Sequence, residues 1–414
     1  MTAYLITIGD EILIGQITDT NAAWMAQQLN AQGIRLVGKA TVGDVHQHIV
    51  AAIGAAWEKA DLVLMTGGLG ATKDDITKKA IAEYFDVPMI WHQETFDRLT
   101  YFFKKIGREP DKMNREGCYM PQNALVLNND RGLAPAMWFE MGKKILVSMP
   151  GVPFEMQHLM SDRVLPKLLT SFPISPIVHR TILTAGTGET ALAAQLSEFE
   201  DRLPENLKLA YLPSLGTVRL RLTATGTDEK ELENQVKIFG DEMIQIVGAP
   251  VFGEGNLSLP KAIGNILMKK NQTMATAESC TGGYVSHLVT ADAGCSAYFK
   301  GSIVAYDNAV KTNILNVDEN LLAIEGAVSE AVVRAMVAGV CARTGADVGI
   351  AISGIAGPTG ATEQKAVGTI WLAAGTAENI ITYQYSLDRG RDKNIEFASY
   401  NALNLLRKFL NSQK

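Results

Sequence analysis

Along the first 150 residues, short continuous apolar runs alternate with longer segments whose apolar positions recur every three or four residues. Continuous apolar runs are typical of strands buried on both faces, and the longer period is typical of amphipathic helices. Strands that alternate with helices predict an α/β fold with a doubly wound, mostly parallel sheet, in which ligands bind beyond the carboxyl ends of the strands. The predicted strands are 4–9, 35–44, 61–66 and 143–149, and the predicted helices are 21–32, 46–60 and 75–85.

The segment from about residue 175 to 251 has a different pattern and predicts a small β-α-β-β-α unit. In one of its strands Val218, Leu220 and Leu222 alternate with Arg219 and Arg221, which predicts one buried and one solvated face. The two arginines could contact RNA, but we interpret them as solvated edge positions and the unit as a spacer or dimer-forming domain. The predicted strands are 180–186, 207–213 and 217–226, and the predicted helices are 189–203 and 228–248.

The last segment again alternates strands and helices. Two stretches rich in Pro and Gly, FPISPI at 172–177 and GAPVFGEGNLSLP at 248–260, separate the three segments. We therefore predict domains at 1–172, 173–253 and 254–414. The predicted strands of the last domain are 272–277, 301–306 and 348–353, and its predicted helices are 283–294 and 308–315.

Length and composition agree with a multidomain folded protein. A chain of 414 residues is too long for one comfortable core. The net charge of −6 comes without a basic stripe, so no stable nucleic-acid binding is expected. Four isolated cysteines without a CxxC pair argue against a zinc ribbon and suit a reducing compartment. With no signal peptide or membrane-spanning run predicted, we expect a cytoplasmic protein.

A glycine-rich loop follows the third predicted strand, in the stretch TGGLGATKDD. Gly67, Gly68 and Gly70 permit positive φ and let a phosphate approach backbone N–H groups. The stretch is neither a Walker A loop nor GxGxxG. It therefore predicts a phosphate site without naming the ligand.

Carboxylates follow three strands of the same predicted sheet. Asp10 and Glu11 end the first strand, Asp44 ends the second, and Asp74 and Asp75 follow the glycine-rich loop. Asp74 and Asp75 could simply cap the next helix, because helix N-termini favour anions. Their convergence with the other carboxylates beside a phosphate loop instead favours Mg²⁺ bridging a phosphate.

The stretch AESCTGG places two potential nucleophiles, Ser279 and Cys280, in a predicted turn between a strand and a helix. Such a turn exposes one side chain and directs free N–H groups toward a ligand, as acyl transfer requires. The alternative is a plain helix cap, with Ser279 or Thr281 as the N-cap residue.

A base for this nucleophile must come from elsewhere in the domain. His287 lies about 12 Å from Ser279 along a helix, too far for a Ser–His pair. Lys311, in the first turn of a helix that Asp307 would cap, offers a Ser/Lys arrangement. Burial would lower the pKa of Lys311, and Asp307 would oppose that shift. The alternative is an ordinary solvated lysine.

These motifs resemble the CinA family of competence/damage-inducible proteins. The C-terminal domain of that family is similar in AESCTGG, VAYDNAVK, GAVSE, ISGIAGP and VGTIW, which occur here in order. IGDEIL, DTN, MTGGLGATKDDIT and MPGVPFEM resemble the family's N-terminal domain, which is related to molybdopterin-binding proteins. The middle segment resembles the family's KH-type module.

The resemblance implies that the C-terminal domain is an amidohydrolase of pyridine nucleotide salvage. It converts nicotinamide mononucleotide to nicotinate mononucleotide and ammonia without a cofactor. Ser279 is then the nucleophile, Lys311 the base and Tyr306 the assisting residue, and Cys280 is a buried neighbour. The implied substrate-binding residues are Thr281, Gly282, Gly283, Asn308, Gly354 and Arg391.

For the N-terminal domain the resemblance implies hydrolysis of ADP-ribose with a divalent metal, Mg²⁺, Mn²⁺ or Co²⁺. Asp10, Glu11, Asp74 and Asp75 would hold the metal and the pyrophosphate, beside the glycine-rich loop. The resemblance also favours a homodimer. Two alternatives stay open: a pterin-binding first domain, and a non-enzymatic scaffold in DNA uptake or repair. The departures from the family pattern that bear on these activities are Ala71, Lys73, 114–121, Asp307 and Thr359.

Overall fold

The computed structural model describes residues 1–70, 76–105, 107–172 and 175–413. The chain forms two compact units, one of Met1–Val178 with Thr225–Leu232 and one of His179–Ala224 with Glu233–Lys414. Among the described residues, no helix is both long and apolar enough to cross a membrane.

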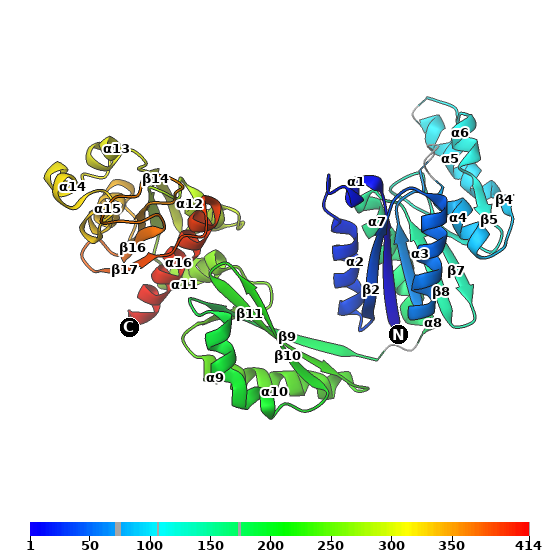
Figure 1. Ribbon diagram of the computed structural model, residues 1–414, viewed down its shortest axis with the longest axis horizontal. Helices are drawn as coiled ribbons and strands as arrows, with labels where there is room; N and C mark the ends of the chain where they lie inside the picture. Colours follow the sequence, from blue (N-terminus) through cyan, green and yellow to red (C-terminus); the bar gives the residue numbers. More distant parts are fainter. Residues whose placement is uncertain (71–75, 106, 173–174, 414) are drawn as a thin grey trace. The chain divides into compact units, whose positions relative to one another are not determined.

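The first unit is built around a six-stranded sheet in the order β2-β1-β3-β8-β7-β6 (Figure 1). β2, β1, β3 and β8 are parallel. β7 pairs antiparallel with β8, and β6 pairs antiparallel with β7. The parallel part confirms the predicted α/β sheet. Its elements are β1 (Thr2–Ile8), α1 (Asp10–Leu13), α2 (Thr20–Ala31), β2 (Arg35–Val42), α3 (His46–Lys59), β3 (Leu62–Thr66), α4 (Thr77–Tyr84), β4 (Met89–Trp91), α5 (Gln93–Lys105), α6 (Lys112–Glu116), β5 (Tyr119–Pro121), β6 (Leu125–Leu127), β7 (Ala136–Met141), β8 (Lys144–Met149), α7 (Pro153–Leu159), the π-helix η1 (Met160–Val164) and α8 (Leu165–Ser171).

Two apolar cores cover the two faces of this sheet, because successive strand residues point to opposite sides. Leu62 and Leu64 of β3 enter the core that contains α2, α7 and α8. Val63 and Met65 enter the core that contains α3 and α4. This two-sided burial explains why the strands are continuous apolar runs in the sequence.

The second unit contains a four-stranded sheet and a five-stranded sheet. Its elements are β9 (Ile177–Ala185), α9 (Glu189–Asp201), β10 (Leu207–Ser214), β11 (Thr217–Thr225), α10 (Glu229–Val247), β12 (Val251–Glu254), α11 (Leu259–Lys270), β13 (Met274–Glu278), α12 (Tyr284–Thr290), the 3₁₀ helix η2 (Cys295–Ala297), β14 (Phe299–Val304), α13 (Asn308–Asn313), α14 (Glu319–Glu325), α15 (Glu330–Thr344), β15 (Val348–Gly354), β16 (Thr369–Gly375), β17 (Ile380–Ser386) and α16 (Arg391–Ser412).

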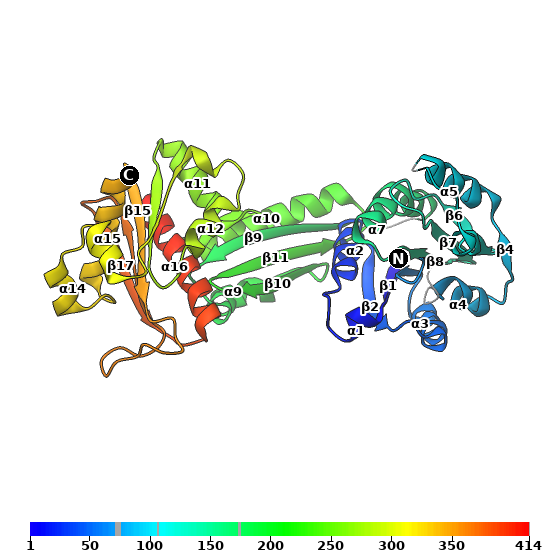
Figure 2. The ribbon, with the colours of Figure 1, turned by 90° about the horizontal axis from the view of Figure 1, so that it is seen from above.

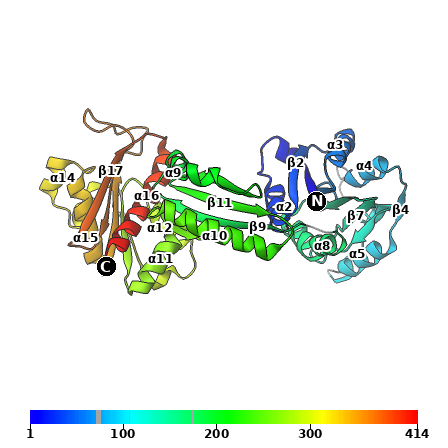
Figure 3. The same cartoon turned by 90° about the horizontal axis from the view of Figure 1, so that it is seen from below.

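The four-stranded sheet has the order β10-β11-β9-β12 and lies beside α9 and α10 (Figure 3). The predicted alternation of β11 is confirmed for Val218, Leu220 and Leu222, which are buried, and for Arg219, which is exposed. Arg221 is half-buried, and β11 lies between β10 and β9, so the interpretation of the two arginines as edge positions is wrong. The two helices contact each other through Phe199 and Phe239, whose ring centroids lie 6.3 Å apart. β12, which the sequence pattern did not predict, pairs antiparallel with β9.

The five-stranded sheet has the order β14-β13-β15-β16-β17, and α15 and α16 cover its opposite faces (Figure 2). β14, β13 and β15 are parallel. β16 pairs antiparallel with β15, and β17 pairs antiparallel with β16, so β17 runs in the same direction as β15. As a result, the carboxyl ends of β14, β13, β15 and β17 meet at one edge of the sheet.

The last helix is tied to the four-stranded sheet by a buried arginine. Arg407 of α16 is 2% exposed and donates to the carbonyl oxygens of Ala249 and Val251, at 3.0 Å each. Its Nε donates to Asn404 Oδ1 at 3.0 Å. The two sheets of the second unit are therefore joined by hydrogen bonds as well as by apolar packing.

Candidate active site

The carboxyl edge of the five-stranded sheet gathers the predicted catalytic residues from distant parts of the chain. Glu278, the last residue of β13, pairs with Val304 of β14 and with Ile352 of β15. Ser279 therefore emerges between the ends of two neighbouring strands. The Ala305 N–H donates to the Glu278 carbonyl at 2.8 Å, which holds the segment leading to α13 against the same turn.

The turn after β13 has the left-handed backbone that its paired glycines allow. Gly282 has φ 59° and Gly283 has φ 98°. Gly283 is the N-cap residue of α12 and, as a glycine, has no side chain that could cap this helix. The interpretation of Ser279 or Thr281 as the N-cap residue is therefore wrong. Ser279 is 8% exposed, and its own N–H donates to the Ile352 carbonyl at 3.0 Å.

A buried carboxylate that the sequence analysis missed organises this turn. Glu278 is 0% exposed, and its Oε2 accepts from Thr281 Oγ1 at 2.8 Å and from the N–H groups of Gly283 and Val285. Its Oε1 accepts from the Ser286 N–H at 2.9 Å. The expectation that these N–H groups stay free for a ligand is therefore wrong for Gly283, Val285 and Ser286.

Lys311 is withdrawn from water, so the interpretation as a solvated lysine is wrong. It is 1% exposed, and its Nζ donates to the carbonyl oxygens of Ala305 at 2.8 Å and Tyr306 at 3.1 Å. Asp307 caps α13 as predicted and accepts from the Ala309 N–H at 2.7 Å. Burial lowers the pKa of Lys311, and the charge of Asp307 partly opposes this shift.

Cys280 is a poor nucleophile in this environment. Its side chain is buried, and desolvation raises the pKa of the thiol to about 12, with the Glu278 charge acting in the same direction. A thiol attacks as its thiolate, so Cys280 is almost fully protonated near neutral pH. The predicted burial of Cys280 is confirmed, and its role in the reaction stays a prediction.

Tyr306 and Arg391 meet at the edge, although they are 85 positions apart in the chain. Arg391 Nη2 donates to the Tyr306 hydroxyl at 3.0 Å, and Nη1 donates to the Gly357 carbonyl at 2.7 Å. Tyr306 is 58% exposed. The pair therefore leaves an accessible phenol beside a guanidinium, which suits contact with an anionic substrate group.

The other residues predicted to bind the substrate in this domain differ in their exposure and in their hydrogen bonds. Asn308 is exposed at the start of α13. The Thr281 hydroxyl is committed to Glu278, so a substrate contact from Thr281 would have to use its backbone N–H. At Gly354 a Cβ would lie 2.6 Å from Ile370 Cγ1, so strand packing already explains this glycine. Thr281, Gly282 and Gly283 line a hollow of about 520 Å³ together with residues of α12 and α16.

The corresponding edge of the first unit carries the predicted metal-binding residues. Asp10 and Glu11 follow β1 as the first residues of α1, and both are exposed. The Asp10 N–H donates to Asp44 Oδ2 at 3.3 Å, so the ends of β1 and β2 do meet. Asp74 and Asp75 lie outside the described residues. Among the described residues, no three His, Cys, Asp or Glu side chains form a group that could hold a metal.

The glycine-rich loop lies at the same edge. Gly67 has φ 108° and Gly68 has φ 63°, and a Cβ at either position would lie within 2.2 Å of a neighbouring atom. These two glycines are therefore required by backbone conformation and close packing, whether or not a phosphate binds. Gly70 is exposed at the end of the described part of this loop. Asn21 donates from Nδ2 to the Gly151 carbonyl at 2.7 Å.

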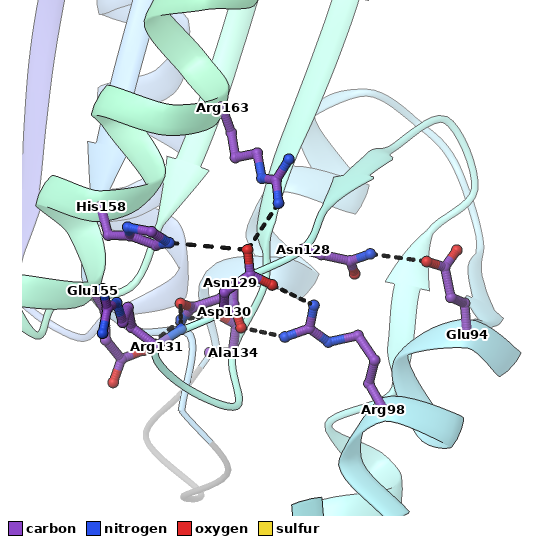
Figure 4. A network of polar contacts seen from close by, with 10 residues as sticks. All are labelled: Glu94, Arg98, Asn128, Asn129, Asp130, Arg131, Ala134, Glu155, His158 and Arg163. Atoms are coloured by element: carbon purple, nitrogen blue, oxygen red, sulfur yellow. Dashed lines mark hydrogen bonds and ion pairs between the residues drawn. The ribbon is translucent and has the colours of Figure 1, made fainter. Parts of the chain in front are cut away.

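A polar network fixes the β6–β7 loop at this edge (Figure 4). Asp130 accepts from Arg163 at 2.8 Å and from Arg98 at 3.3 Å, and these arginines lower the pKa of its carboxyl group. Asn129 is 1% exposed and donates to Glu155 Oε2 at 2.6 Å. The loop thereby connects α5 with α7 and η1. These contacts leave no periodic pattern in the sequence.

Three family models match successive parts of the chain. They are a "Probable molybdopterin binding domain" at residues 4–170, the "Damage-inducible protein CinA KH domain" at 179–253 and the "CinA C-terminal domain" at 256–410. These matches confirm the predicted three-domain architecture. The domain bounds drawn from the sequence stay predictions.

Relatives match over the full length. A CinA-like protein of Cytophaga hutchinsonii is 43% identical over 412 residues, covering 100% of this chain and 99% of that protein. Another from Flavobacterium psychrophilum is 37% identical and covers 99% of this chain and 98% of that protein. A crystal structure of a competence damage-inducible protein from Klebsiella pneumoniae is 32% identical, covers 38% of this chain and 97% of its own, and has a TM-score of 0.37. The chain belongs to the CinA family.

Proposed function

We propose that the C-terminal domain hydrolyses the amide of nicotinamide mononucleotide, giving nicotinate mononucleotide and ammonia. The observation that carries this proposal is Lys311: a buried lysine with a lowered pKa, held by two neutral carbonyl groups at the strand edge that presents Ser279. A lysine with a lowered pKa becomes neutral at a lower pH than an ordinary lysine, and its neutral form can act as a general base toward a serine hydroxyl.

The two carbonyl partners of Lys311 suit this role. A neutral amine has two N–H bonds and one lone pair. The Ala305 and Tyr306 carbonyl oxygens can accept both N–H hydrogens, which leaves the lone pair as the remaining polar feature of Nζ. We propose that this lone pair accepts the proton of Ser279.

The proposed first step forms an acyl-enzyme. Ser279 Oγ attacks the amide carbonyl carbon while its proton passes to Lys311 Nζ, and the carbonyl oxygen becomes an oxyanion. When this intermediate collapses, the C–N bond breaks and the leaving nitrogen takes the proton from Lys311, so that ammonia departs. Ser279 is then joined to the substrate through an ester bond.

The second step reverses these roles with water. Water attacks the ester carbonyl and loses a proton to Lys311. Collapse breaks the ester C–O bond and returns that proton to Ser279 Oγ, releasing the carboxylic acid. Tyr306 and Arg391 are proposed to contact the substrate at the mouth of the site, and no cofactor is required.

The test uses the purified full-length protein. We expect ammonia and nicotinate mononucleotide in equal amounts from nicotinamide mononucleotide, and a lower kcat/KM for the riboside that lacks the phosphate. A matched control is Asp347→Asn, which alters a carboxylate at the opposite end of β13 that accepts from Thr273. It should keep the activity. Absence of ammonia from a folded wild-type protein would instead favour the non-enzymatic scaffold.

For the N-terminal domain, we propose metal-dependent hydrolysis of ADP-ribose. The supporting observation is that Asp10, Asp44, Gly67 and Gly68 follow parallel strands at one edge. The described residues do not complete a metal site by themselves, so Mg²⁺, Mn²⁺ or Co²⁺ would depend on Asp74 and Asp75 as well. A divalent ion would supply charge neutralisation of the pyrophosphate. Small nucleotides are thus the proposed partners, in a cytoplasmic homodimer.

A further inference from the structure

The carboxylate of Glu278 is the most heavily hydrogen-bonded side chain near the candidate nucleophile. Besides the turn contacts already described, its Oε1 accepts from Thr276 Oγ1 at 3.2 Å and from Ser302 Oγ at 3.4 Å. Each carboxylate oxygen thus accepts three donors. A carboxylate has only acceptor sites, and this environment offers it only donors.

This arrangement decides which N–H groups of the turn remain available. The N–H groups of Gly282, Tyr284 and His287 donate to backbone carbonyls within the turn and the helix. The three that donate to Glu278 are likewise occupied. In the described part of the chain between 279 and 287, only the N–H groups of Cys280 and Thr281 donate to no oxygen, and the Cys280 N–H contacts its own sulfur. Both immediately follow Ser279.

We propose that Glu278 is a positioning residue of the nucleophile turn. By binding the N–H groups of Gly283, Val285 and Ser286, it fixes the turn so that Ser279 Oγ faces the substrate. The N–H groups of Cys280 and Thr281 are thereby left to stabilise the oxyanion. Glu278 itself contacts no substrate atom. This inference rests on the proposed acyl transfer at Ser279 and adds the group that holds its geometry.

The first test is Glu278→Gln, which conserves the shape of the side chain. The amide NH₂ of glutamine can donate to the hydroxyl partners but cannot accept from an N–H group. It would therefore leave either the Ser286 N–H or the N–H groups of Gly283 and Val285 without an acceptor. We expect kcat for nicotinamide mononucleotide to fall about 10²-fold, the loss typical of a disturbed oxyanion site, with KM changed less than about threefold. Glu278→Gln with wild-type kcat and an unchanged fold would overturn the proposal.

A second variant covers the case in which Glu278→Gln does not fold. Thr281→Val conserves volume and removes the hydroxyl that donates to Glu278 Oε2 at 2.8 Å. We expect kcat to fall about tenfold at constant KM, because the turn keeps most of its hydrogen bonds. A merely structural role would lower the fraction of folded enzyme but leave kcat per titrated active site unchanged. Asp347→Asn is again the matched control.

A labelling experiment separates failure of this proposal from failure of the proposed function. Phenylmethanesulfonyl fluoride reacts with a positioned serine by attack of Oγ on sulfur, loss of fluoride and release of the serine proton. The rate at which Ser279 is labelled therefore reports the turn without requiring the natural substrate. We expect Glu278→Gln to be labelled at least about tenfold more slowly than the wild type. Equal rates would overturn the role of Glu278 alone, whereas a wild-type Ser279 that is not labelled would contradict the nucleophile on which both proposals rest.

Discussion

The carboxyl edges of the two large sheets differ in the burial of the charged side chains that are predicted to act there. At the edge of the second unit, Glu278 is 0% and Lys311 is 1% exposed, and each has its hydrogen-bond partners supplied by the protein. At the edge of the first unit, Asp10 and Glu11 are exposed on a helix of four residues. The fold thus buries Glu278 and Lys311 at one edge and leaves Asp10 and Glu11 facing solvent at the other.

This difference has a chemical consequence. Buried groups are held in place before a substrate arrives, so the second unit can position a nucleophile and a base without a metal ion. Exposed carboxylates repel one another and gain their geometry from a bound cation. The comparison therefore predicts that substitutions at the first edge act through metal affinity, whereas substitutions at the second act on the chemical step.

The largest effect is expected at the nucleophile. Ser279→Ala should lower the rate of ammonia release from nicotinamide mononucleotide by about 10³-fold or more, because the attacking oxygen is lost. Cys280→Ser should keep most of the activity, since its buried thiol is protonated. Single-turnover assays on folded variants measure both. The reverse pattern would assign the attack to Cys280 and remove the contrast between the two edges.

The base should come next. Lys311→Arg keeps the positive charge but cannot lose it, so activity should fall about 10²-fold to 10⁴-fold. Lys311→Met should be equally inactive, with substrate binding measured by calorimetry nearly unchanged. In the wild type, kcat should rise with pH through an apparent pKa below that of an ordinary lysine. If Lys311→Arg restored activity that Lys311→Met loses, the lysine would act only through its charge.

A smaller effect is expected at the first edge. Asp74→Asn or Asp75→Asn should lower ADP-ribose hydrolysis at limiting Mn²⁺ at least about tenfold, with partial recovery at saturating metal. Deamidation by the same variants should be unchanged, because residues 74 and 75 belong to a different domain from Ser279. Chromatographic quantification of AMP across a metal titration provides the measurement. A loss that high metal does not restore would contradict the idea that the cation organises this edge.

The smallest effect concerns stability. Burial lowers the pKa of Lys311 in the folded state, so the unfolded chain binds more protons between the folded pKa and the unfolded value. Lys311 therefore disfavours folding below that window, and this penalty disappears as pH rises through it. With increasing pH, the free energy of unfolding should therefore rise more for the wild type than for Lys311→Met. Urea titrations at several pH values measure this difference between the two proteins. A difference that does not change with pH would mean that Lys311 is charged in the folded state.

The sequence predicted the positions of both edges better than their internal contacts. Ser279 could be located because a buried strand, a paired glycine and a helix follow one another locally. Glu278 stayed hidden because its partners include Ser302 on a neighbouring strand, and a glutamate beside a serine has no periodic signature. Arg391 could be placed against Tyr306 only once the register of β17 was known.

The unpredicted part of the first unit has a similar explanation. Between the predicted helix 75–85 and the predicted strand 143–149, the structure contains several strands of three residues, such as β4, β5 and β6. Elements this short are fixed by long-range contacts and not by local pattern. Asp130 illustrates this point, because its arginine partners lie 32 and 33 positions away.

Arg407 limits the positions at which recombination between relatives could exchange parts of this chain. Its two backbone acceptors, at Ala249 and Val251, precede the predicted boundary at 253, whereas the arginine follows it. A recombination event at that boundary would join Arg407 to foreign acceptors, and burial already lowers the pKa of this guanidinium. A cation that loses buried partners is destabilising. Exchanges between relatives should therefore be tolerated upstream of Ala249 and disfavoured in the glycine-rich stretch that follows, so the last helix is inherited together with the strand it holds.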